Sequence, residues 1–66
     1  MSLGEGARQL KMAAHDAQVA FDCVGLGDLE RAQEHAVTAR AAVAAAEAAL
    51  ARALQDMTTE EAQAAG

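Results

Sequence analysis

The chain has 66 residues and a formal net charge of −5, and 20 of its residues are alanine. A chain of this length forms at most one domain and has too few large apolar side chains for a sizeable core of its own. Acidic residues outnumber basic ones by 10 to 5, and Phe21 is the single aromatic residue. We therefore expect no nucleic-acid site, which needs a basic surface, and no attraction to anionic membranes.

The sequence shows no sign of a signal peptide or of a membrane-spanning segment. The first residues lack a basic segment followed by an apolar core. No apolar stretch reaches the length of about 18 residues that a transmembrane helix needs. We expect a cytoplasmic protein.

The composition predicts helix almost throughout, because alanine, leucine, glutamate and arginine favour helix and proline is absent. The first predicted helix spans about residues 3–24 and begins with a Ser-x-x-Glu capping box from Ser2 to Glu5. A turn is predicted at 25–28, where glycine can close one helix and Asp28 can cap the next.

The second predicted helix spans about residues 29–57, and the short turn makes the two helices antiparallel neighbours. A second capping box begins at Thr58, so residues 58–66 are predicted to form a loose C-terminal tail with at most a short turn. The predicted fold is all-α: residues 1–66 form a single antiparallel two-helix hairpin.

Alanine-rich heptad packing is predicted to hold the two helices together. In the first helix, apolar residues recur at alternating spacings of four and three, at Leu3, Ala7, Leu10, Ala14, Ala17, Phe21 and Val24. In the second helix, one predicted core column is alanine throughout, at Ala32, Ala39, Ala46 and Ala53. The other column is Leu29, Ala36, Val43, Leu50 and Met57. Alanine at every seventh position allows two helix backbones to approach closely.

Both helices carry apolar residues outside these predicted core positions. A second stripe on the first helix holds Met12, Val19 and Cys23, and Glu47 is the only charge within residues 41–51. A helix that is apolar on more than one face is normally covered on more than one side. We therefore expect a homodimeric four-helix bundle, ahead of a larger homo-oligomer or a complex with a helix of another protein. The residues expected in the interface are Met12, Val19, Cys23, Val43, Leu50, Leu54 and Met57.

Two further features point to a second copy. The second predicted helix overhangs the first by about two turns, and this leaves too little of the first helix to cover the residues near the free end, Leu50, Ala53, Leu54 and Met57. Arg40 and Glu47 occupy equivalent heptad positions beside the predicted core, where they can form salt bridges between chains.

His15, His35 and Cys23 are the residues with potential chemistry. Zinc sites need three or four ligands, commonly as closely spaced Cys or His pairs, and the sequence has no such pair. Asp22 beside Cys23 opposes thiolate formation. We therefore expect no enzyme, no catalytic residue, no cofactor and no metal ion. Two alternatives stay open: a disulfide between chains at Cys23, and a small-molecule or metal-binding helical bundle that uses all three residues across subunits.

Residues 27–39 resemble the second half of a tetratricopeptide repeat, since a glycine ends a helix and Ala32 and Ala39 follow seven apart. In that family, stacked repeats bind extended peptides. The first half of the motif is absent, because Ala20 and Cys23 stand where the family has Gly and Tyr, and about three repeats are normally needed. We assign no family, and we predict a non-enzymatic protein–protein interaction or assembly module that self-associates by helix packing.

Overall fold

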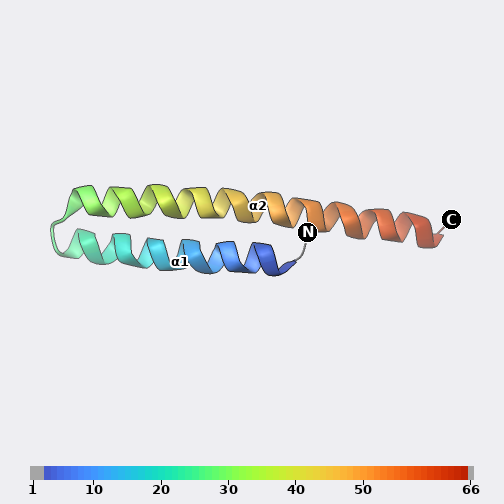
Figure 1. Cartoon of the computed structure of the whole chain (residues 1–66), viewed down its shortest axis with the longest axis horizontal. Coiled ribbons are helices and arrows are strands. Elements are labelled where there is room, and N and C mark those ends of the chain that lie inside the picture. The colour runs from blue at the N-terminus through green and yellow to red at the C-terminus, as the bar shows by residue number, and fades with distance from the viewer. Residues whose placement is uncertain (1–2, 66) are drawn as a thin grey trace.

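The computed structural model describes residues 3–65, which form a hairpin of two α-helices (Figure 1). Helix α1 spans Leu3–Gly25 and helix α2 spans Leu29–Ala65. The molecule is a rod with extents of 59 × 14 × 13 Å. The predicted all-α two-helix hairpin is confirmed, with the first helix ending one residue later than predicted. Ser2, the predicted N-cap of α1, lies outside the described residues.

The turn between the helices is closed by backbone hydrogen bonds around Gly27. The N–H of Asp28 donates to the carbonyl of Cys23 at 2.9 Å, and the N–H of Gly27 donates to the carbonyl of Val24 at 3.0 Å. This pattern closes a helix when the residue after its end is left-handed, and Gly27 has a φ of 79°. The Asp28 carboxylate then accepts a hydrogen bond from the N–H of Arg31 at 3.2 Å. The predicted glycine closure and the predicted Asp28 cap are both confirmed.

The two glycines of the turn give a matched pair of variants. We expect Gly27→Ala to lower the free energy of unfolding by about 1–2 kcal/mol, because a side chain at positive φ is strained. Gly25 lies inside α1, and an added Cβ meets nothing within 4 Å. We therefore expect Gly25→Ala to be neutral or to stabilise by up to about 1 kcal/mol. Urea unfolding at one protein concentration measures both, and equal effects would contradict this account of the turn.

Small side chains make the contact between α1 and α2. The buried residues of this contact, which we call the alanine seam, are Gly6, Ala13 and Cys23 from α1 and Ala32, Ala42, Ala46 and Ala49 from α2. Ala46 and Ala49 are each 1% exposed, and no large side chain of the described chain is fully buried. A Cβ added to Gly6 would lie 3.7 Å from the Cβ of Ala49. Gly6 therefore lies level with Ala49, and the same antiparallel alignment places Ala13 level with Ala42.

The predicted heptad packing is right for one column and wrong for the rest. In α2 the predicted alanine column does face α1, since Ala32 and Ala46 are buried and Ala39 and Ala53 are half-buried. The predicted core column of α1 is exposed throughout, and so is the column from Leu29 to Met57 in α2. The physical reason is side-chain size: alanine and glycine on both helices permit a close approach that leucine and phenylalanine would prevent. The hairpin therefore closes on its small side chains and leaves the large ones outside.

Helix α2 continues through Ala65, so the predicted loose tail is wrong over the described residues 58–65. The Thr58 hydroxyl donates to the carbonyl of Leu54 at 3.0 Å, and the Thr59 hydroxyl donates to that of Gln55 at 3.0 Å. The threonines therefore bond back within one continuous helix and do not cap a new one. The last residues of α2 extend well past the start of α1 (Figure 1).

Candidate functional site

Most of the large exposed apolar side chains gather on one side of the hairpin, and Met12, Leu26 and Val37 are exposed elsewhere. Leu10 follows the half-buried Gln9, and Val43 follows the buried Ala42, so each points about 100° further round its helix than the seam. The seam residues of the two helices face each other, and the helices run in opposite directions. A rotation of about 100° in the same sense along each chain therefore brings Leu10 and Val43 to the same side of the hairpin. We call this side the apolar face. It consists of Leu3, Leu10, Phe21 and Val24 from α1 and Leu29, Val43, Leu50, Leu54 and Met57 from α2, with Ala7, Ala14, Ala17 and Ala36 between them.

The apolar face is open to solvent in the single chain. Its large side chains range from 38% exposed at Leu50 to 73% exposed at Phe21. Large apolar side chains exposed together along one side of a helix pair mark a site of contact with another molecule. The apolar face is therefore the candidate functional site of this protein.

The opposite side of the hairpin is mostly polar, with Met12 exposed among its charged residues. Its exposed residues include Arg8, His15, Arg31, Glu34 and Arg52. Arg8 forms a salt bridge with Glu5. A hydrogen bond from Gln9 and the charge of Arg8 lower the pKa of the Glu5 carboxyl. The hairpin is thus amphipathic as a unit, with one polar side and one apolar side.

Four of the predicted interface residues lie together on the apolar face: Val43, Leu50, Leu54 and Met57. Cys23 does not belong to this group, because it is 6% exposed within the alanine seam. Its side chain contributes to the hairpin itself and is covered without a second chain. The alternative of a disulfide between chains at Cys23 therefore requires the seam to open.

Met12 and Val19 also lie away from the apolar face. Met12 comes two residues after Leu10, which places it about 160° round α1, on the far side of the seam. Val19 is half-buried at the edge of the seam on that same side. The stripe predicted from Met12, Val19 and Cys23 is therefore a border of the hairpin contact, and the apolar surface of α1 lies along Leu10 and Phe21.

The apolar residues of α1 are identifiable from the sequence, but the predicted contact between them and α2 is wrong, because they are exposed. Their regular spacing is equally compatible with packing inside the hairpin and with packing on a second molecule. The residue that distinguishes packing inside the hairpin from packing on a second molecule is Gly6, which shares one side of α1 with Ala13 and Ala20. Three small residues spaced by seven indicate the side on which the partner helix approaches most closely.

The candidate metal ligands do not come together within the chain. The ring Nδ1 of His35 is hydrogen-bonded to the carboxylate of Asp16 at 3.0 Å, across the two helices. His15 is exposed on the polar side, while Cys23 is buried in the seam. Among the described residues, no group of three His, Cys, Asp or Glu side chains is placed to hold a metal ion. The alternative bundle site would have to draw these residues from several copies.

The bond between Asp16 and His35 is expected to contribute to hairpin stability. Both side chains are partly buried, with exposed fractions of 15% for Asp16 and 33% for His35. We expect His35→Ala to lower the free energy of unfolding by about 1 kcal/mol. We expect the exposed control, His15→Ala, to change it by less than about 0.5 kcal/mol. A double-mutant cycle with Asp16→Ala checks the pair, and strict additivity would contradict a direct interaction.

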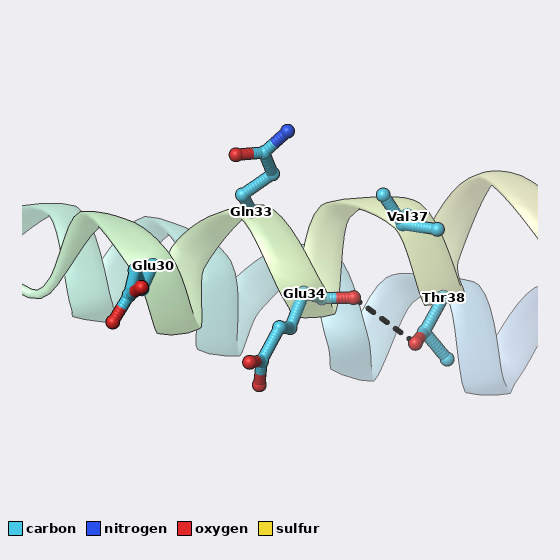
Figure 2. A pocket seen from close by; sticks show the side chains of 5 residues that line it. All are labelled: Glu30, Gln33, Glu34, Val37 and Thr38. Atoms are coloured by element: carbon cyan, nitrogen blue, oxygen red, sulfur yellow. Dashed lines mark hydrogen bonds between the residues drawn. The ribbon is translucent and has the colours of Figure 1, made fainter.

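A surface hollow on the outside of α2 offers no enclosed site. It is lined by Glu30, Gln33, Glu34, Val37 and Thr38, all from one helix. Figure 2 shows these side chains spreading away from one another, with α1 behind them and no wall opposite. The Thr38 hydroxyl donates to the carbonyl of Glu34 at 3.1 Å, as a threonine within a helix does. Nothing here surrounds a substrate or aligns reacting groups.

Neither helix is both long and apolar enough to cross a membrane over the residues described. Comparison with family models, with curated proteins and with solved structures finds no match for this chain.

Proposed function

We propose that this chain is a non-enzymatic assembly module, and that its apolar face packs against the same face of a second copy. Two hairpins joined in this way form a homodimeric four-helix bundle. The observation that carries the proposal is the division of side chains by size, with small residues inside the hairpin and most of the large apolar residues exposed along one side of both helices.

The energetics of a short chain support this proposal. Full burial of a large apolar side chain is worth roughly 1.5–3 kcal/mol. The alanine seam buries only small side chains, and a domain of this length is marginal with even a normal core. Covering the apolar face removes nine large side chains per copy from water. Folding and association then stabilise each other.

The concentration dependence of unfolding tests the proposal. Because two chains separate when the dimer unfolds, its Tm rises with protein concentration. We expect the loss of helical circular dichroism to shift upward by several degrees between about 5 and 500 μM. A Tm that stays constant over this range, with a sharp transition, would contradict self-association. It would favour a helix of another protein as the molecule that covers the apolar face.

A further inference from the structure

The proposed dimer leaves open how the two copies are oriented, and the apolar face itself favours one answer. Gly6 lies level with Ala49, since an added Cβ would lie 3.7 Å from the alanine Cβ. Each step forward along α1 matches one step back along α2 in an antiparallel hairpin. Met12 is therefore level with Val43, and a single line perpendicular to the rod passes both residues.

The level of this line is also the midpoint of the apolar stripe on α2, which runs from Leu29 to Met57. The stripe on α2 has an apolar residue at every seventh position from Leu29 to Met57. Val43 is the central residue of this series. A two-fold axis that runs across the apolar face at Val43, perpendicular to the rod, relates the two copies. It places Leu29 of one copy beside Met57 of the other, and it places Val43 beside its own equivalent.

The stripe on α1 is centred at the same level. Its outermost large residues before the turn region are Leu3 and Phe21, and their midpoint is Met12. Reversal about this level places Leu3 of one copy beside Phe21 of the other, while Ala7 meets Ala17. Each large side chain at an end of this stripe thus meets another large one, while Leu10 meets the small Ala14. Val24 extends the stripe by one position toward the turn.

We propose that the two copies pair in opposite directions about this axis, so that the turn of each hairpin lies beside the overhang of α2 in the other. The proposal rests on the self-association argued above and specifies its geometry. The overhanging Leu54 and Met57, which α1 of the same chain does not reach, are then covered by residues near Leu29 of the second copy.

Charge complementarity supports the same orientation. Arg40 and Glu47 are exposed at the outer edge of the apolar face, three residues before and four residues after Val43. Among the described residues, neither takes part in a salt bridge of its own chain. In the opposite-direction dimer, Arg40 of each copy lies within one residue of the level of Glu47 of the other, so two such pairs form.

Pairing in the same direction would lose these contacts. A two-fold axis parallel to the rod packs α2 of one copy beside α1 of the other. The facing edge of α1 carries Ala7, Lys11 and Ala14, so Arg40 would meet no carboxylate there and Glu47 would have only Lys11 near its level. Interfacial charges of this kind select orientation more than they add affinity.

Cysteine cross-linking in a Cys23→Ala background tests the orientation. We expect Val43→Cys to form a disulfide-linked dimer on mild oxidation, because the two copies of this residue meet at the axis within the separation that a disulfide spans. Met57→Cys alone should not cross-link, since its two copies lie about 40 Å apart. A mixture of Leu29→Cys and Met57→Cys chains should cross-link to each other. Ala45→Cys, exposed on the polar side, is the matched control and should stay reduced.

Charge reversal gives an independent measurement. We expect Arg40→Glu to raise the dissociation constant of the dimer about tenfold, and the double variant Arg40→Glu/Glu47→Arg to restore it to within about threefold. The orientation is overturned if the protein is dimeric, yet Met57→Cys cross-links alone or the double variant is no tighter than Arg40→Glu. A monomeric protein with no cross-link overturns the proposed function as well, so the two failures are distinguishable.

Discussion

Replacing Val43 by aspartate is expected to convert the dimer into a monomer at concentrations where the unmodified chain is fully paired. Val43 lies at the centre of the apolar face and is 40% exposed in the single chain. In the dimer, the change removes two buried side chains, each worth roughly 1.5–3 kcal/mol, and brings two carboxylates together. We therefore expect the dissociation constant to rise by more than about 100-fold. Size-exclusion chromatography with light scattering measures the change in mass.

Ala45→Asp is the control for this variant, because Ala45 is exposed on the polar side two residues further along α2. Aspartate costs the helix about the same at either position. We expect the control to remain dimeric, with a dissociation constant within about threefold of the unmodified chain. Equal behaviour of the two variants would show that the apolar face is not the contact between copies.

Replacing Ala46 by leucine is expected to disrupt the hairpin itself. Ala46 is 1% exposed in the alanine seam, where α1 lies directly against it. Overpacking a well-filled core typically costs about 1–3 kcal/mol, and here the added atoms meet another helix at close approach. We expect a loss at the upper end of this range, which is a large part of the stability of so short a chain. Chemical unfolding followed by circular dichroism measures it.

Ala48→Leu is the matched control, since Ala48 is exposed on the same helix and leucine is nearly as good a helix former as alanine. We expect this variant to unfold within about 0.5 kcal/mol of the unmodified chain. If Ala46→Leu were as stable as Ala48→Leu, the helices would not be packed as closely as the alanine seam requires.

The helices and the turn are predictable from the sequence because their determinants are local. Alanine-rich composition, the glycines near the break and the Asp28 cap act within a few residues, and the structure confirms each of them. The end of α2 is harder to predict. A threonine at position 58 suits a helix cap and a helix interior alike, and the sequence around it contains no glycine or proline that would force a break.

The side of each helix that faces the other is not a local property. Helix α1 has two sides that could pack on α2, one that contains Gly6 and Ala13 and one that contains Leu10 and Phe21. Simple hydrophobicity favours the larger residues, and the heptad pattern therefore predicts these inside the hairpin. Close approach between backbones favours the smaller ones, and only the pairing of both helices decides the outcome. This is why Cys23 was expected at an interface and lies in the seam.

Sedimentation equilibrium of the unmodified chain tests the central claim most directly, because it measures the mass of the assembly independently of its shape. The claim is that the apolar face is covered by a second copy of the 6.7 kDa chain. We predict a single species of twice this mass at about 50 μM, and its dissociation on dilution to the low micromolar range or below. A mass equal to one chain throughout this range would contradict the account.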